Sequence, residues 1–244
     1  MTKTLCIDIG GTGLKAAIVA LDGAMLTERV KIKTPYPCPP ERLLAELPKL
    51  VAGLGEFDRI SVGFPGLVRH GLIWHVPALS RSTYGGQIDE QLRAAWHGFN
   101  MEEAVREVFG KPTKVANDAD VQGCAVVNGR GFEFVMTLGT GVGTAVFSDG
   151  VLLPHMELSH APFRKGESFD TQLGNAQRKE IGEGRWARRV YRAIESFDAF
   201  LYFDQIHIGG GNAKYLDPDR LPAKARIVSN TAGLLGGVRI WELS

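Results

Sequence analysis

The stretch LCIDIGGTGLKAAIVALDG, Leu5–Gly23, places two apolar runs on either side of a Gly-Gly-Thr-Gly turn and ends in Asp22–Gly23. Runs rich in Ile, Leu and Val that are broken by Asp-Gly indicate strands joined by tight turns, because Asp and Gly accept the positive φ of a two-residue hairpin. The glycine turn therefore connects strand to strand. A P-loop and a Rossmann turn both lead into a helix, so this stretch matches neither motif.

The same arrangement returns in FVMTLGTGVGTAVFSDGVLL, Phe134–Leu153, with a strand, a Gly-Thr-Gly turn, a second strand, an Asp-Gly turn and a third strand. A single glycine-rich hairpin is weak evidence, because tight turns need glycine in any case. Two matched copies predict an internal duplication, with one glycine loop from each lobe facing a shared cleft.

Helical patterns occupy much of the remaining sequence. Residues 89–99 and 100–110 carry apolar side chains at three- and four-residue spacing, and the second segment starts at a candidate N-cap, Asn100, and ends at Gly110. Residues 183–200 place Trp186, Val190, Ile194 and Phe197 on one helix face. This alternation predicts an α/β fold in two lobes.

Two further segments complete the expected order of elements. YFDQIHIGGGNAK, residues 202–214, predicts a strand that runs into a glycine turn opening a helix, and the proline-rich residues 34–41 predict a loop within the first lobe.

The composition is that of an ordinary globular protein. The 244 residues carry a formal net charge of +1, with 44% hydrophobic and 23% charged residues, so nothing predicts a nucleic-acid partner. Three cysteines without a CxxC pair argue against a disulfide framework or a cysteine-rich zinc site, and favour a reducing cytoplasmic location. Neither a signal peptide nor an apolar run of about 18 residues is expected, so no membrane span is predicted.

The glycine loops offer the groups that phosphoryl transfer requires. Such a reaction spreads the donor's charge over backbone N–H groups, hydroxyls and a metal ion. Asp8 ends the first strand and is a candidate to hold Mg²⁺ through water, although a carboxylate bonded to turn N–H groups is the simpler alternative. The candidate phosphate contacts are Gly10, Gly11, Thr12, Gly13, Lys15, Gly139, Thr140 and Gly141.

A candidate base lies in KVANDADVQG, Lys114–Gly123, after a short apolar strand. Asn117 is suited to bind a hydroxyl and Asp118 to accept its proton. In an extended chain Asp118 and Asp120 would share one side. The alternative is that Asn and Asp cap a following helix, which is the simpler interpretation of this segment taken alone.

Glu157 and His160, three residues apart in HMELSHAPFRKGE, are a second polar pair. Zinc needs more ligands than this spacing supplies. The pair is suited to hydrogen-bond sugar hydroxyls, and otherwise belongs to a solvated loop.

Taken together and in order, six segments resemble the ROK (repressor, ORF, kinase) family of the sugar kinase and actin-like ATPase superfamily. The segments are DIGGTGLKAAIV, GFPGLV, VANDAD, LGTGVGTAVFSDG, ELSHAPFRKG and IHIGGGNAK. PFRKGESFDTQLG is similar to the polyphosphate glucokinase branch of that family.

The resemblance implies two ribonuclease H-like lobes around a central cleft, residues 1–117 and 118–231, with a helix at about 232–244 packing back on the first lobe. It implies phosphoryl transfer from polyphosphate, ATP or both to the 6-hydroxyl of a hexose, with glucose as the first expectation. A homodimer is expected, because dimers are the default for a soluble enzyme of this kind. Asp118 is then the general base and Asp8 positions Mg²⁺, and no structural zinc is expected.

The resemblance also assigns the remaining site residues. Asn117, Glu157 and His160 would hold sugar hydroxyls. Gly209, Gly210, Gly211 and Asn212 would lie against the nucleotide or the far end of a polyphosphate. A basic track for a long polyanion would use Arg164, Lys165, Arg178, Lys179, Arg185, Arg188 and Arg189, unless these side chains are solvated helix faces.

Two departures from the family pattern bear on the substrate. Ser159 replaces the glycine of the usual Glu-x-Gly-His segment, and Ala78 stands where an asparagine often contacts the sugar. A different sugar, or a non-catalytic sugar- or nucleotide-binding protein, therefore stays an alternative. The repressors of the family carry a helix-turn-helix before the first glycine loop, which here begins at residue 10.

Overall fold

The computed structural model describes residues 2–228 and 233–243. These residues form two compact units: unit 1 contains residues 2–125 and 233–242, and unit 2 contains residues 126–228 and 243. The predicted boundary between Asn117 and Asp118 is wrong, because the observed boundary lies between Ala125 and Val126. Helix α4 (Asp118–Val126) therefore belongs to unit 1 except for its last residue. Residue 232, where the last helix was expected to begin, lies outside the described residues.

Unit 1 is organised around a five-stranded sheet in the order β3-β2-β1-β4-β8. The strands β1, β2 and β3 pair antiparallel, whereas β1, β4 and β8 run parallel. The bounds are β1 Lys3–Ile9, β2 Gly13–Ala20, β3 Val30–Lys33, β4 Arg59–Phe64 and β8 Thr113–Asn117.

Unit 2 repeats this plan with the sheet order β11-β10-β9-β14-β15. Its hairpin strands are again antiparallel, and β9, β14 and β15 are parallel. The bounds are β9 Phe132–Leu138, β10 Val142–Ser148, β11 Val151–Leu152, β14 Gln205–Gly209 and β15 Ala225–Ile227. The same order and directions in both units confirm the predicted duplication and the α/β fold.

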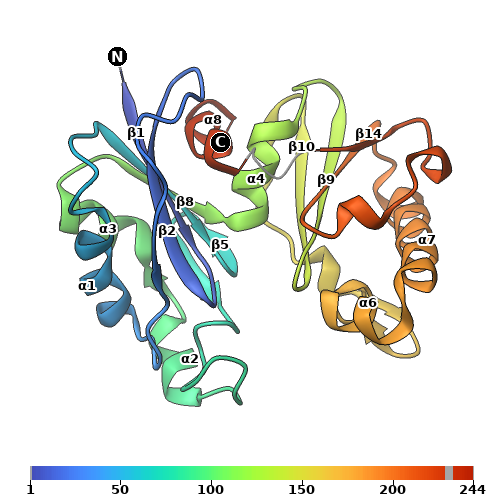
Figure 1. Ribbon diagram of the computed structural model, residues 1–244, viewed down its shortest axis with the longest axis horizontal. Helices are drawn as coiled ribbons and strands as arrows, with labels where there is room; N and C mark the ends of the chain where they lie inside the picture. The colour runs from blue at the N-terminus through green and yellow to red at the C-terminus, as the bar shows by residue number, and fades with distance from the viewer. Residues whose placement is uncertain (1, 229–232, 244) are drawn as a thin grey trace. The chain divides into compact units, whose positions relative to one another are not determined.

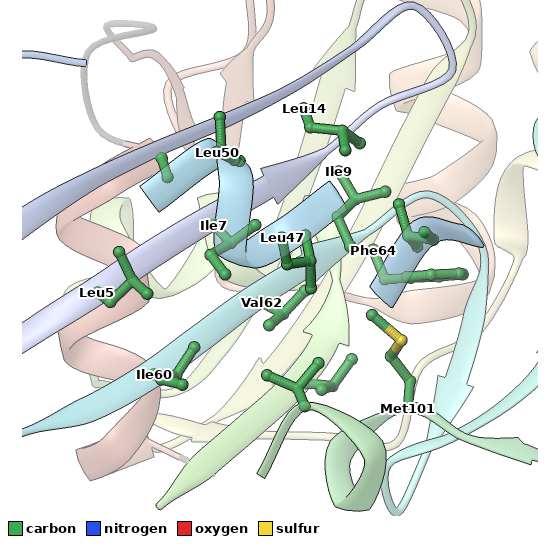
Figure 2. Close-up of a cluster of buried hydrophobic side chains, with 14 of the residues drawn as sticks. Leu5, Ile7, Ile9, Leu14, Leu47, Leu50, Ile60, Val62, Phe64 and Met101 are labelled. Carbon is green, nitrogen blue, oxygen red and sulfur yellow. The ribbon is translucent and has the colours of Figure 1, made fainter. Parts of the chain in front are cut away.

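Both faces of the unit 1 sheet are covered by helices (Figure 1). Alternate β1 residues, Leu5, Ile7 and Ile9, are buried with side chains of α1 (Pro40–Val51) and α3 (Met101–Phe109), and Figure 2 shows this cluster. Cys6 faces the other way, where it packs with Val238 of α8 (Gly233–Leu243). The period-2 alternation of a strand between two helical layers accounts for this division.

Helix α8 is also tied to the sheet by polar contacts. The Ser61 hydroxyl donates to the Gly237 carbonyl, and Trp241 Nε1 donates to Ser61 Oγ over 2.8 Å. The Arg59 guanidinium lies 4.8 Å from the centre of the Trp241 ring. Residues about 180 positions apart in the sequence therefore form one layer of unit 1.

The helices predicted at 89–99, 100–110 and 183–200 form, although the first ends at Trp96 and Phe99 lies in the short strand β7 (Phe99–Asn100). The Asn100 side chain accepts from Glu103 N–H at the start of α3, and Gly110 ends that helix with φ 63°. In unit 2, α7 (Glu183–Leu201) buries the predicted apolar face of Trp186, Val190, Ile194 and Phe197 against the β9–β14 sheet. Capping and apolar spacing are local signals, which is why the sequence predicts them.

The two Asp-Gly turns that the sequence predicts differ from each other in length. Asp149 and Gly150, with φ 47° and 82°, form the predicted two-residue turn between β10 and β11. The first Asp-Gly turn is instead a three-residue loop, because Ala20 N–H donates to Ala24 O and only Gly23 of the Asp22–Gly23 pair has a positive φ. After β14 the predicted helix is only the short 3₁₀ turn η2 (Ala213–Tyr215).

The other elements are short. Unit 1 contains β5 Leu67–Arg69, β6 Leu72–His75, β7 Phe99–Asn100 and α2 Glu90–Trp96. Unit 2 contains η1 Leu158–His160, β12 Pro162–Arg164, β13 Glu167–Ser168, α5 Phe169–Leu173, α6 Asn175–Ile181 and η3 Pro218–Arg220. Among the helices of the described residues, none has the length and apolar character needed to cross a bilayer.

Candidate active site

Three parallel strands of unit 1 bring candidate residues to one edge of the sheet. Asp8 on β1 is opposite Gly63 on β4, and Phe64 on β4 is opposite Asn117 on β8. A Cβ on Gly63 would lie 3.6 Å from the Cα of Asp118. Ligands of open α/β sheets bind outside the carboxyl ends of the strands, which is where these residues lie.

The first glycine loop is a closed turn between β1 and β2. Gly10 N–H donates to Gly13 O over 3.0 Å. The Lys15 ammonium donates to Asp8 Oδ2 over 2.9 Å from the directly opposite position on β2, and both side chains are 43% exposed. Asp8 therefore pairs with Lys15, where the alternative was a bond to turn N–H groups. The ion pair brings the candidate metal ligand and the candidate phosphate-binding cation together.

The side chain of Asn117 is engaged within unit 1. Its Oδ1 accepts from Ala119 N–H over 2.7 Å, and its Nδ2 donates to Gly66 O over 2.9 Å. This is the capping arrangement that the local sequence favours. An amide side chain has a second lone pair and a second proton, so one acceptor site and one donor remain for a substrate hydroxyl.

Asp118 and Asp120 both lie in the first turn of α4. The extended alternative is therefore wrong, and two residues along a helix the side chains diverge by about 200°. Asp120 is buried at 3% exposure, whereas Asp118 is half-buried at the start of the helix. The helix N-terminus favours the ionised form of a carboxylate, which is the form that accepts a proton.

The second glycine loop, in unit 2, is held by residues that the sequence analysis missed. Asp170 Oδ1 accepts from Val142 N–H over 2.7 Å, and Asn175 N–H, at the start of α6, donates to Thr140 O over 3.0 Å. Gly139 N–H donates to Gly141 O, so this loop closes one residue shorter than the first, where Gly10 N–H donates to Gly13 O. Asp170 belongs to the PFRKGESFDTQLG segment, but the sequence does not reveal this contact, because its partner lies 28 residues earlier.

The predicted segment after β14 joins this second loop. β14 lies parallel to β9, so Gly209 is opposite Thr137. Asn212 is buried, with its N–H on Leu138 O and its Nδ2 on Gly139 O at 2.9 Å. Gly210 has φ +86°, and a Cβ there would lie 2.2 Å from Leu138 O, so this close approach requires glycine.

Glu157 lies between two histidines in unit 2. Its Oε2 is 3.8 Å from His160 Nε2, and its Oε1 is 3.6 Å from Nε2 of the buried His155. The spacing of the sequence pairs Glu157 with His160, whereas the contact with His155 appears only in the structure. Ser159, between the pair, is buried at 1% exposure, so its hydroxyl belongs to the packed side of the 3₁₀ turn η1.

The basic residues of the candidate track fall into two groups, those that are bonded or partly buried and those that are exposed. Arg178 is 12% exposed at its side chain, bonds Asn175 and Glu183, and stacks 4.2 Å from the Tyr215 ring centre. It therefore supports the second glycine loop through Asn175. Burial, and next the charge of Arg164, lower the pKa of Arg189, which places two cations near each other. The exposed members are Arg164, Lys165, Lys179, Arg185 and Arg188.

The acidic groups fit a magnesium ion held mainly by its substrate. Within residues 2–228 and 233–243, no group of three or more His, Cys, Asp or Glu side chains is placed to form a metal cage. Mg²⁺ commonly binds through one or two carboxylates, several waters and the phosphates of the donor. Asp8, partly exposed beside the first glycine loop, meets that requirement.

Comparison with known proteins connects this architecture to sugar kinases. The chain is 29% identical over 245 aligned positions to a protein named polyphosphate glucokinase from Mycobacterium tuberculosis (strain ATCC 25177 / H37Ra), covering 94% of this chain and 88% of the relative. The crystal structure of inorganic polyphosphate/ATP-glucomannokinase from Arthrobacter sp. strain KM superimposes with a TM-score of 0.81 at 27% identity, covering 100% of this chain and 99% of that one.

A third comparison shows the likeness of fold alone. The structure of a ROK family glucokinase from Streptomyces griseus in complex with glucose and AMPPNP has a TM-score of 0.76 at 16% identity, with 98% of each chain covered. The model of the ROK family matches residues 4–157, more than half of the sequence. That span includes both glycine hairpins, the Asn117–Asp118 pair and Glu157, and the chain therefore belongs to the ROK family.

Proposed function

We propose that the protein is a hexose kinase that transfers a phosphoryl group from polyphosphate or ATP to the 6-hydroxyl of a hexose, with glucose as the preferred acceptor. The observation that carries the proposal is the duplicated glycine hairpin, with Asp8 and Asp118 at one edge of the unit 1 sheet. The names of the mycobacterial and Arthrobacter relatives support the same reaction.

Asp118 is the proposed general base. In phosphoryl transfer the base takes the proton of the attacking hydroxyl, while most of the catalysis comes from positioning and charge stabilisation. Asp118 begins α4 directly after the buried strand β8, so its backbone is anchored on both sides. Asn117 holds the helix start through Ala119 N–H and offers its remaining donor and acceptor to a sugar hydroxyl.

The glycine loops are the proposed phosphate sites. Gly10, Gly11, Thr12, Gly13 and Lys15 act from unit 1. Gly139, Thr140, Gly141 and the Gly209–Asn212 segment act from unit 2. Backbone N–H groups of such turns form concave anion sites. Mg²⁺ would neutralise charge on the donor phosphates, with Asp8 holding one of its waters, and Lys15 would leave Asp8 to contact the phosphate.

Glu157 and His160 are the proposed contacts to the sugar ring hydroxyls. A carboxylate accepts hydrogen bonds from two hydroxyls, and an imidazole adds one donor or acceptor. Because Ser159 is buried, its presence in place of glycine is compatible with such contacts. Ala78 adds no polar group, which is why the choice of sugar needs measurement.

The proposal is tested by assaying phosphoryl transfer to glucose, mannose, fructose and N-acetylated hexosamines, with ATP and polyphosphate supplied separately and Mg²⁺ present. We expect turnover with glucose and at least one of the two donors. Transfer to another sugar only would correct the acceptor. If folded protein transfers no phosphate in any combination of sugar and phosphoryl donor, the kinase proposal is overturned.

The exposed basic residues predict a preference for long donors. Reversing Arg164 and Lys165 to Glu is expected to raise KM for long-chain polyphosphate by about tenfold or more and KM for ATP by less than about threefold, since only a long polyanion extends over a charged surface. The measurement is the initial rate against each donor at two salt concentrations.

A matched control changes the net charge equally elsewhere. Lys111 and Arg192 are exposed and belong to no proposed contact, so Lys111→Glu with Arg192→Glu should leave both KM values nearly unchanged. Equal effects of the Arg164 and Lys165 reversals on ATP and polyphosphate would contradict a polyphosphate track.

A further inference from the structure

The segment between β3 and α1, residues 34–39, forms hydrogen bonds to the first glycine loop. Thr34 Oγ1 donates to Gly10 O over 2.5 Å, and the Tyr36 hydroxyl donates to Gly11 O over 2.7 Å. These contacts join residues 24 and 25 positions apart. The sequence analysis predicts only a proline-rich loop here, so these two side chains have no role in the proposed function.

The segment is itself anchored in the core of unit 1. Thr34 is buried at 8% exposure, and two positions after Tyr36 the Cys38 carbonyl accepts from Trp96 Nε1 over 2.9 Å. Trp96 is 1% exposed, and its ring centre lies 5.3 Å from that of Phe64. The prolines at 35, 37, 39 and 40 further restrict the backbone. Thr34 and Tyr36 therefore contact the loop from a fixed position.

Holding a carbonyl also fixes the next amide. The peptide bonds after Gly10 and Gly11 are trans and planar, so each C=O points opposite to the N–H of the following residue. Thr34 and Tyr36 thereby set the directions of Gly11 N–H and Thr12 N–H. Within the part of the chain that the structure describes, neither of these two N–H groups donates to a protein acceptor.

We propose that Thr34 and Tyr36 are positioning residues, which orient the Gly11 and Thr12 amides toward a phosphate group of the donor. This inference rests on the proposed function and extends it, because it assigns the orientation of the loop to two side chains outside the glycine motif. Amide N–H groups that are already oriented need no reorganisation when the phosphate binds.

The chemistry of Tyr36 suits this task. Burial, and next the neighbouring Cys38, raise the pKa of Tyr36, so the phenol keeps its proton at physiological pH and remains a donor. Its oxygen also lies 2.9 Å from Ala78 O, and since a phenol has one proton, it donates to one carbonyl at a time. A Cβ on Gly11 would lie 3.4 Å from the Ala78 Cβ, so loop, tyrosine and Ala78 are in close contact.

The test measures binding of tripolyphosphate with Mg²⁺ to the full chain by isothermal titration calorimetry. Tyr36→Phe and Thr34→Val, which each remove one hydroxyl, are expected to raise Kd by about threefold to tenfold. Thr34→Ser keeps the hydroxyl and should restore wild-type binding. In ¹H–¹⁵N spectra, tripolyphosphate should shift the Gly11 and Thr12 amides of the wild type, and shift them less in Tyr36→Phe.

Control measurements separate positioning from simple structural support. Tyr84→Phe removes the hydroxyl of an exposed neighbouring tyrosine, whose ring centre is 6.4 Å from that of Tyr36, and should leave Kd unchanged. If the wild type transfers phosphate, KM for the sugar should stay within about twofold in Thr34→Val, because the hydrogen bond that is lost goes to Gly10 O of the glycine loop.

Several results would overturn the positioning role. They are a Kd in Tyr36→Phe and Thr34→Val equal to that of the wild type, a melting temperature that falls while Kd stays constant, or a wild type whose Gly11 and Thr12 amides do not respond to tripolyphosphate. Failure of the kinase proposal is distinct: the wild type would bind tripolyphosphate, with the expected effects of the variants, and transfer no phosphate to any sugar.

Discussion

Asp118→Asn is expected to lower kcat by about 10²–10⁴-fold at saturating sugar and donor, because the amide cannot accept the proton of the attacking hydroxyl. The substitution keeps the size of the side chain and leaves the start of α4 intact, since the cap is Asn117 Oδ1, which accepts from Ala119 N–H. KM for the sugar should change little, because an amide still hydrogen-bonds a hydroxyl. The measurement is steady-state phosphoryl transfer with each donor.

The matched control is Asp89→Asn on α2 of the same unit. Asp89 Oδ1 accepts from Gln91 N–H and Leu92 N–H, and Asn is an equally good N-cap, so activity and melting temperature should both be retained. An Asp118→Asn protein that keeps more than about a tenth of the wild-type kcat would remove Asp118 as the base.

Glu133→Gln is expected to be the most destabilising of the conservative substitutions, by about 3–5 kcal/mol in the free energy of unfolding. The Glu133 carboxylate is 0% exposed and accepts from the N–H groups of Asn128, Gly129 and Arg130. His207 Nε2 lies 2.6 Å from its Oε2. A glutamine has a single acceptor oxygen, so some of these donors lose their partner in the interior.

The same site predicts how stability depends on pH. Burial by itself raises the pKa of Glu133, but the hydrogen bonds from Asn128 N–H, His207 and Gly129 N–H outweigh it, so the net pKa lies below the ordinary value of 4.5. A carboxyl whose pKa is lower in the folded state stabilises the native state at pH values above its unfolded-state pKa. This stabilisation is lost as pH falls through the folded-state pKa. The stability difference between wild type and Glu133→Gln should therefore shrink as pH falls below about 4.5.

Urea unfolding at several pH values, followed by circular dichroism, measures both effects. Glu195 is exposed on α7, and Glu195→Gln should change the free energy of unfolding by less than about 0.5 kcal/mol at every pH. A difference between wild type and Glu133→Gln that stays constant as pH falls from 7 to well below 4.5 would show that the lost charge is not the cause. His207→Gln separates the contribution of the imidazole from that of the three N–H groups.

The site was predictable where the signal is local. The glycine loops follow from turn chemistry, and each closes by a backbone N–H to C=O bond within the loop. The pair of Asn117 and Asp118 follows from its place between a strand and a helix. The contacts of Asp170, Asn175 and His155 were not predictable, because their partners are set by the fold. Arg178 has the sequence appearance of a solvated cation although it is bonded and stacked.

The sequence by itself determined the α/β class, the duplicated hairpins, the caps at Asn100 and Gly110, and the membership of the ROK family. Each of these depends on residue types within a few positions, or on motifs in a fixed order. Tertiary structure was needed to show that α4 stays with unit 1 and that Thr34 and Tyr36 hold the first glycine loop. Such contacts depend on which strands become neighbours, and strand order is set by packing of the whole sheet, because local periodicity carries no record of it.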